Sequence, residues 1–164
     1  MFGKLKGLFH ADKAIEITAP VSGTAVPLSE VADPTFAQGI LGRGVAVIPS
    51  EGRIVAPADG TIDLMFETGH AVSMTTADGA EVLIHVGLDT VQLHGKHYQV
   101  RCQDGDKVVR GQTLIEFDHE AIRAEGYDII TPVIVCNTEA FSSIHVEKNG
   151  EVAAGDVLLT LHKQ

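Results

Sequence analysis

Two histidines stand beside runs of residues that are otherwise typical of buried β-strands. His85 ends the apolar stretch 82–84, and His70 precedes the run 71–74. A buried imidazole is a core residue held by a neighbour, a metal ligand or a nucleophile. Two imidazoles brought together could do chemistry that neither does alone, so their relative position decides among these interpretations.

The residues between the two histidines predict a β-hairpin. The dipeptide DG at 78–79 is a strong turn signal. With a loop at 76–79, antiparallel pairing places His70 directly opposite His85. With a loop at 78–79 alone, His85 pairs with Val72 and His70 lies on the diagonal of the same face. Both registers predict that the two Cβ atoms lie about 5 to 7 Å apart on one face.

Paired imidazoles on a sheet face allow three interpretations. They could share a metal ion such as Zn²⁺, although a protein zinc site normally needs three or four ligands. They could carry out phosphoryl transfer, one ring as nucleophile and the other as hydrogen-bond donor to the phosphoryl oxygens. They could also be a chance cross-strand pair.

The neighbours of His70 favour a docking surface. Thr68 lies two residues before it, which predicts the same strand face, and its hydroxyl could hold an imidazole or a phosphoryl oxygen. Phe66 and Val72 share this parity and predict an apolar rim. An apolar patch around a reactive imidazole suits a docking protein better than a deep substrate pocket.

The elements that must position these residues are predicted to be β-strands. From Ile15 onward, short runs rich in Val, Ile and Thr, including 80–86 and 90–93, are separated by Gly and Pro. This pattern predicts an all-β fold, a compact antiparallel sandwich or barrel. Two short helices are expected at 33–42 and 118–126, each beginning at an aspartate N-cap.

The chain contains an internal repeat. APVSGT at 19–24 recurs as APADGT at 56–61, and VVRGQTL at 108–114 recurs as VAAGDVL at 152–158. Two copies of each unit predict a duplicated β motif, whereas a solenoid would need at least three regular repeats.

Length and charge limit the function further. The chain has 164 residues and a net charge of −10, which fits a single domain over 15–164. The acidic balance argues against nucleic-acid binding and suits a partner with a basic face. Two cysteines are too few for a disulfide framework, so we expect a cytoplasmic location. No apolar run approaches the roughly 18 residues of a membrane span.

The segment 1–14 differs from the rest of the chain. It contains three lysines, and apolar residues recur at helical spacing within 2–9. The segment is either a flexible basic terminus or a short amphipathic helix that makes peripheral contact with an anionic membrane. Both interpretations stay open, because one or two turns of helix are marginal alone in water.

At the two histidines the sequence resembles a known family. FETGHAVSM (66–74) and GAEVLIHVGLDTVQLHG (79–95) are similar to the glucose-type enzyme IIA of the bacterial phosphoenolpyruvate-dependent sugar phosphotransferase system. The likeness continues through 30–62, 105–118 and 131–139, and so covers nearly the whole chain from about residue 15. It implies a β-sandwich with a duplicated hybrid motif, in agreement with the repeats.

The resemblance also implies a phosphocarrier. In such a protein His85 would accept a phosphoryl group at Nε2 from the histidine-containing phosphocarrier protein. It would pass the group to a cysteine of a IIB domain, whose membrane IIC partner moves the sugar. His70 would assist transfer, and Thr68 matches the threonine beside it. No cofactor is required, and we expect a monomer.

The docking residues implied by the resemblance surround this pair. Asp33 and Asp89 match acidic positions that face a partner arginine near the phosphoryl group. The apolar rim, to which shared parity adds Val72, comprises Phe36, Ile40, Leu41 and Phe66. Arg43 stands where an acidic or neutral residue is usual in the family.

Two alternatives of other classes are weighed beside the phosphocarrier. A regulatory binding module could use the same histidine face, and His70 with His85 could hold Zn²⁺ there if a partner's carboxylate completed the site. A zinc hydrolase would use His85 and Asp89 as half of a metal site, but its second half, His-x-His, is absent. The remaining histidines are predicted to be incidental or solvated loop residues: His10, His94, His97, His119, His145 and His162.

Overall fold

The computed structural model describes residues 14–164, and its regular elements are nearly all short strands. The predicted segment 1–14, with the membrane contact at 2–9, therefore lies outside the described residues except for Ala14. In chain order the elements are β1 (Ile15–Thr18), β2 (Gly23–Pro27), η1 (Leu28–Glu30), α2 (Pro34–Ala37), β3 (Arg43–Pro49), β4 (Arg53–Val55), β5 (Gly60–Met65), β6 (Ala71–Thr76), β7 (Glu81–His85), η2 (Thr90–Leu93), β8 (Tyr98–Val100), β9 (Lys107–Val108), β10 (Thr113–Phe117), α3 (His119–Ala124), β11 (Thr131–Val135), η3 (Thr138–Ala140), β12 (Phe141–Val146), β13 (Gly150–Val152) and β14 (Val157–Lys163).

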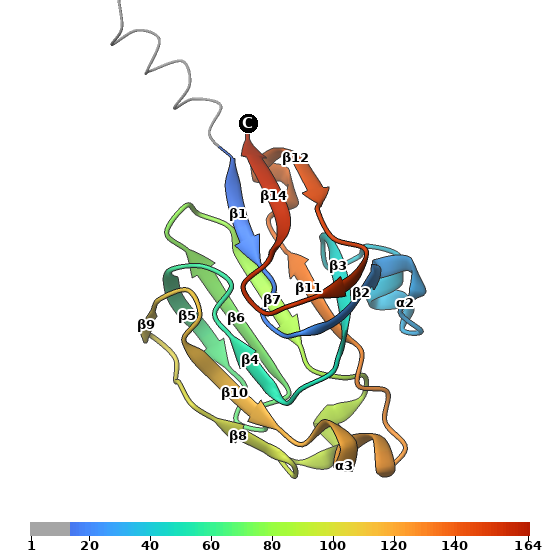
Figure 1. The fold of residues 1–164 in the computed structure, drawn as a ribbon. Coiled ribbons are helices and arrows are strands. Elements are labelled where there is room, and N and C mark those ends of the chain that lie inside the picture. The colour runs from blue at the N-terminus through green and yellow to red at the C-terminus, as the bar shows by residue number, and fades with distance from the viewer. Residues whose placement is uncertain (1–13) are drawn as a thin grey trace, which may run out of the picture.

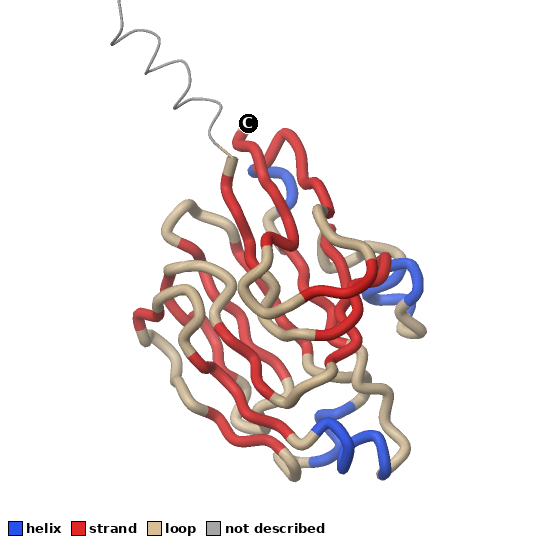
Figure 2. Tube along the Cα trace, in the orientation of Figure 1, coloured by secondary structure: helices blue, strands red, loops and turns tan. Residues whose placement is uncertain are grey.

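Within residues 14–164 the strands form three sheets, and all neighbouring strands pair antiparallel. One sheet has eight strands in the order β13-β2-β3-β11-β7-β6-β5-β9, and two have three strands, β1-β14-β12 and β4-β10-β8. Figure 1 shows β12 and β14 beside the C-terminus and α3 at the opposite end of the molecule. Figure 2 shows how little helix accompanies the strands. The predicted all-β sandwich is confirmed.

Side chains that alternate between the two faces of each strand form the hydrophobic core. In β7, Val82 and Ile84 are buried in the main hydrophobic cluster, whereas Leu83 and His85 point to the other face and are half-buried. A smaller cluster forms on that other face, where Phe36 of α2 packs with residues of β3 and β11. The one-turn helix α2 thus covers an apolar patch and brings its residues toward His85.

The two copies of each repeat make backbone hydrogen bonds at equivalent positions. Each AP-x-x-GT unit leads into a strand that begins at its glycine, β2 at Gly23 and β5 at Gly60. The matched bonds are Thr18 N to Pro57 O (2.9 Å) with Val55 N to Pro20 O (2.8 Å), and Gly155 N to Ala19 O (3.0 Å) with Gly111 N to Ala56 O (2.9 Å). The two copies therefore interlock reciprocally, as a duplicated unit should.

The helices are shorter than predicted, although their N-caps are correct. The Asp33 carboxylate accepts from Thr35 N (2.9 Å), and the Asp118 carboxylate accepts from Ala121 N (3.0 Å). The helix expected over 33–42 ends at Ala37, because Gly39 adopts a left-handed φ of 72° that an α-helix cannot continue. No helix within residues 14–164 is long and apolar enough to cross a membrane.

Candidate active site

The hairpin between the histidines has a register that differs from both predicted ones. Ala71 pairs with His85, and the loop has three residues, 77–79. Gly79 ends it with a φ of 91°, as three-residue hairpin loops require. In this register an ideal pleat would place His70 and His85 on opposite faces, so the parity behind the sequence prediction was wrong.

The rings nevertheless meet, because His70 lies outside the strand. Strand β6 begins at Ala71, and Gly69, with a φ of 73°, reverses the chain just before His70. The pleat therefore does not set the direction of the His70 side chain. The centroids of the His70 and His85 rings are 5.2 Å apart at an interplanar angle of 77°. Backbone N–H of Val86 donates to His70 O (2.6 Å) and holds the two segments together.

His70 is the more buried imidazole, with 5 % of its surface exposed. Its Nδ1 hydrogen-bonds the hydroxyl of Thr68, which lies in the β5–β6 connection rather than on a strand face. The Phe66 ring packs edge-on at 5.1 Å between centroids. Burial, and then the neighbouring His85, lower the pKa of His70 from 6.5 to about 4. His70 is therefore neutral at pH 7.

His85 is half-buried and held by a backbone carbonyl. Its Nδ1 lies 2.6 Å from Gly87 O, which can only accept a hydrogen bond, so Nδ1 carries the proton of the neutral ring and Nε2 keeps its lone pair. Burial lowers the pKa of His85, while the bond to Gly87 and the carboxylates of Asp33 and Asp89 act in the opposite direction. His85 thus presents a neutral imidazole with an unprotonated Nε2.

Gly87 itself fits only as glycine. Its φ is 89°, and a Cβ atom would lie 2.6 Å from Thr90 Cγ2 and 3.0 Å from Asp128 O. The Thr90 hydroxyl and the Tyr98 hydroxyl both donate to Val86 O at 2.8 Å, which fixes the peptide before Gly87. The predicted strand at 90–93 is instead the short helix η2, because Asp89 turns the chain with a φ of 59°.

The two predicted acidic residues lie close enough to His85 to affect its titration. The Asp33 carboxylate caps α2, as described above, and is half-buried. The Asp89 side chain is exposed and makes no hydrogen bond or ion pair with any residue of 14–164. Both carboxylates therefore flank the imidazole pair, and that of Asp89 is open to a partner.

The residues of the predicted apolar rim lie at different depths, and their part in docking stays a prediction. Phe36 is buried, with 5 % of its surface exposed, and its ring lies at a tilt to His85 with 5.1 Å between ring centroids, whereas Ile40 and Leu41 are 67 % and 37 % exposed. Phe66 is half-buried beside His70. Val72, by contrast, is only 1 % exposed and belongs to the main core, because the observed register turns it inward. The prediction that Val72 contributes to docking was wrong.

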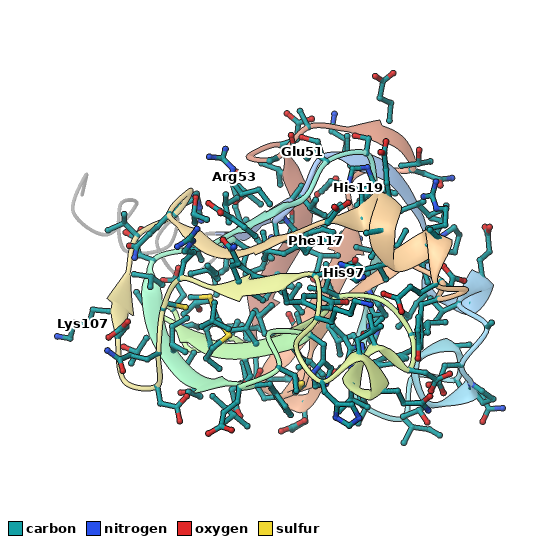
Figure 3. The ribbon with its side chains drawn as sticks, turned by 90° about the horizontal axis from the view of Figure 1, so that it is seen from below. Glu51, Arg53, His97, Lys107, Phe117 and His119 are labelled. Carbon is teal, nitrogen blue, oxygen red and sulfur yellow. The ribbon has the colours of Figure 1, made fainter. Side chains whose placement is uncertain are left out.

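The site lies on the surface rather than in a deep pocket. A broad open hollow of about 910 Å³ is lined by residues of β4, β8 and β10 and of the segments beside them, among them Arg53, His97 and Phe117 (Figure 3), but it contains neither His70 nor His85. His97 bonds the Glu125 carboxylate, which Lys96 also contacts at 3.2 Å. His94 is exposed at a turn with a φ of 53°.

Residues 14–164 offer no complete set of metal ligands. Within residues 14–164 no three His, Cys, Asp or Glu side chains are grouped so that they could hold a metal ion. Zinc at His70 and His85 would therefore need a ligand from a partner, and that idea stays a prediction. The sequence reasoning missed Gly87 O as the group that sets the tautomer of His85, since no side-chain pattern marks a carbonyl.

Together the fold and the site define an all-β domain that carries a neutral imidazole with an unprotonated Nε2 beside a second imidazole. Residues 15–141 match the family described as phosphoenolpyruvate-dependent sugar phosphotransferase system, EIIA 1, and the chain belongs to that family. The resemblance drawn from the sequence is thereby confirmed.

Named relatives agree with this assignment. The glucose-specific EIIA component of Staphylococcus epidermidis is 42 % identical over 156 residues, which cover 95 % of this chain and 92 % of that protein. The beta-glucoside-specific EIIBCA component of Bacillus subtilis is 46 % identical over 159 residues, 97 % of this chain but 26 % of that protein. The chain spans about a quarter of the length of such EIIBCA relatives.

A solved structure has the same fold. The glucose permease IIA from Mycoplasma capricolum superposes with a TM-score of 0.86 at 33 % sequence identity, over 91 % of this chain and 96 % of that one.

Proposed function

We propose that this chain is a phosphocarrier of a sugar phosphotransferase system. His85 accepts a phosphoryl group from the histidine-containing phosphocarrier protein and passes it to a cysteine of the IIB domain of a glucose-type permease. The observation that carries the proposal is the bond between His85 Nδ1 and Gly87 O, which leaves Nε2 unprotonated toward the docking surface. Family membership supports the same assignment.

The acceptance step needs no proton transfer on this chain. The lone pair of His85 Nε2 forms a new N–P bond while the P–N bond to the donor's histidine breaks. The proton stays on His85 Nδ1, hydrogen-bonded to Gly87 O, so the phosphorylated ring is an imidazolium whose positive charge offsets part of the phosphoryl charge. In the onward step the cysteine sulfur forms an S–P bond, the P–Nε2 bond breaks, and His85 returns to its starting tautomer.

The neighbours of His85 supply alignment and charge neutralisation, which are the main requirements of phosphoryl transfer. If the Thr68 hydroxyl donates to His70 Nδ1, the remaining ring proton sits on His70 Nε2, and the 5.2 Å between ring centroids lets it donate to a phosphoryl oxygen. The carboxylates of Asp33 and Asp89 would orient an arginine of the partner beside the same phosphoryl group.

The proposed partners fit the remaining features. The net charge of −10 complements donor and acceptor proteins with basic faces. Relatives include both glucose-specific and beta-glucoside-specific proteins, which supports a sugar choice made by IIB and IIC rather than by this domain. We place the chain in the cytoplasm, where the two cysteines would stay reduced.

The alternatives have less support. A zinc hydrolase needs three protein ligands, and residues 14–164 provide no such group. A purely regulatory module would use the same rim but would not need a nucleophile with a fixed tautomer. A regulatory role in addition to phosphoryl transfer is compatible with the site.

The test is phosphorylation by a reconstituted chain of carriers. The protein is incubated with phosphoenolpyruvate, enzyme I and the histidine phosphocarrier, and acid-labile phosphate is measured. We expect one phosphoryl group per chain, located on His85 and lost in His85→Ala. His94→Ala, which changes an exposed histidine of a nearby turn, serves as the matched control and should label normally. Absence of label on the unaltered protein would sink the phosphocarrier proposal.

A further inference from the structure

A second imidazole pair lies on a different sheet from the first. His145 of β12 and His162 of β14 have ring centroids 6.3 Å apart at an interplanar angle of 83°. In the register of these strands His145 pairs with Thr160 and His162 pairs with Ser143. The two histidines are therefore diagonal neighbours on one face, where long side chains can interact. They were predicted from the sequence to be incidental.

One ring of this pair is oriented and the other is adjustable. His162 Nδ1 lies 3.1 Å from the Ser143 hydroxyl. When that hydroxyl accepts from Nδ1–H, the lone pair of His162 is on Nε2, and a hydrogen bond at the second nitrogen is the usual support of a metal-binding histidine. The exposed His145 ring makes no hydrogen bond with any residue of 14–164, so it is free to rotate.

The spacing suits a shared metal ion. With Zn–N bonds of about 2.0 to 2.1 Å, two imidazoles on one zinc ion have centroids about 5 to 6 Å apart. A small rotation of His145 brings the pair from 6.3 Å into this range. Structural zinc is four-coordinate, and no third His, Cys, Asp or Glu is grouped with the pair in the described chain. The pair is thus half of a zinc site.

A second copy of the chain can supply the other half. In a two-fold symmetric contact the same surface faces itself, so two copies bring four imidazoles to one point. The pair lies on the outward face of the sheet β1-β14-β12, whose opposite face carries the buried Ile144 and Leu161. Each chain has a net charge of −10, which opposes association unless a cation bridges the copies. Self-association on this face should therefore require the metal.

We propose that His145 and His162 form a half-site for Zn²⁺, and that two copies of the chain share one zinc ion through these four imidazoles. The site is separate from the phosphoryl-transfer pair, because His85 belongs to β7 of the eight-stranded sheet. The zinc half-site does not depend on the phosphocarrier function.

The test is a zinc titration of the full chain followed by sedimentation velocity and by calorimetry. All variants carry His85→Ala, because this substitution leaves only His70 at the first pair and so removes a competing two-histidine site. We expect zinc to convert single chains to dimers at one ion per two chains, and EDTA to reverse the change. Adding His145→Gln or His162→Gln should weaken the association at least tenfold.

The controls separate this proposal from zinc binding elsewhere. His94→Gln, at an exposed histidine outside the pair, should dimerise normally, and near-ultraviolet circular dichroism checks that every variant is folded. Dimers that persist in the His145→Gln and His162→Gln variants would overturn the proposal. So would zinc that binds at one ion per chain without dimers, or a titration with no binding at all.

Discussion

The two histidines of the proposed transfer site have different surroundings, which support the different tasks that we propose for them. His85 is held through Nδ1 by a carbonyl and keeps an open Nε2, whereas His70 is nearly buried and held by the Thr68 hydroxyl. In our proposal His85 is the nucleophile, because its Nε2 keeps a lone pair, and His70 stabilises charge on the transferred group.

His70→Gln should separate these tasks. A glutamine amide keeps a hydrogen-bond donor but cannot reproduce the ring geometry, so His85 should still accept phosphate. Because the amide donor no longer lies where the ring N–H would, onward transfer to IIB should slow by about 10²-fold or more, the usual effect when a donor no longer reaches a developing charge. Rapid-quench measurement of phosphate loss to purified IIB checks this. Unimpaired onward transfer would contradict the assisting role.

Burial of His70 also makes stability depend on pH. Its pKa is 6.5 as the ordinary value and about 4 in the folded chain, so between these pH values the unfolded state binds a proton that the folded state does not. The contribution of His70 to the free energy of unfolding is constant above pH 6.5, falls as pH drops toward 4 and is constant below pH 4. The total fall is about 3 kcal/mol at 1.36 kcal/mol per pKa unit.

Urea unfolding at pH 7, 6 and 5 measures this dependence. We expect the free energy of unfolding to fall less steeply with acid in His70→Gln than in the unaltered chain, because glutamine does not titrate. The difference between the two proteins removes the shared effect of the carboxylates. Parallel curves over this pH range would show that His70 titrates normally in the folded state.

At the scale of elements, the sequence predicted the hairpin but not its register. The dipeptide at 78–79 marks a turn, yet loops of two, three or four residues fit the same letters, and each change of one residue reverses the faces. The strand predicted at 90–93 failed because Val91 and Leu93 alternate in a short helix started by a left-handed Asp89. Such backbone conformations leave little trace in side-chain pattern.

The turn after β7 can be tested through Gly87. Gly87→Ala places a methyl group 2.6 Å from Thr90 Cγ2 at a φ of 89°, so it should destabilise the chain by about 2 kcal/mol or more and slow phosphorylation of His85 by displacing Gly87 O. Adding Thr90→Ser removes that methyl contact but keeps the hydroxyl bond to Val86 O, and should recover part of both losses.

A matched control isolates the contribution of the backbone. Gly79 has a similar φ of 91°, but a Cβ there meets nothing within 4 Å. Gly79→Ala should therefore cost only the conformational part, about 1 kcal/mol, with phosphorylation unchanged. Equal losses of stability in Gly79→Ala and Gly87→Ala, measured by urea unfolding, would show that the contact with Thr90 is unimportant.

At the scale of the whole molecule, the fold could be predicted further than the site. Repeats of six or seven residues predicted the duplicated unit, because turns with Gly and Pro impose the same hydrogen bonds in each copy. The arrangement of the docking rim could not be predicted from periodicity, because it depends on how α2 packs across β3 and β11. Val72 was assigned to the wrong face for another reason, because the observed register pairs it with the inward-facing Ile84.

The charge of the whole molecule should control how fast the donor docks. Attraction between an acidic carrier and a basic donor raises the association rate and is screened by salt. We therefore expect kcat/KM for phosphorylation of His85 to fall as ionic strength rises from about 0.01 to 0.15 M, over which the Debye length shortens from about 30 to 8 Å.

Asp33→Asn tests the part of this attraction that is due to the site, because asparagine caps a helix as well as aspartate does and so preserves α2. This variant should lower kcat/KM about threefold or more at low salt and flatten its salt dependence, while Asp63→Asn, on β5 away from the rim, should leave both unchanged. If Asp33→Asn and Asp63→Asn behaved alike, docking would depend on net charge alone rather than on carboxylates placed beside His85.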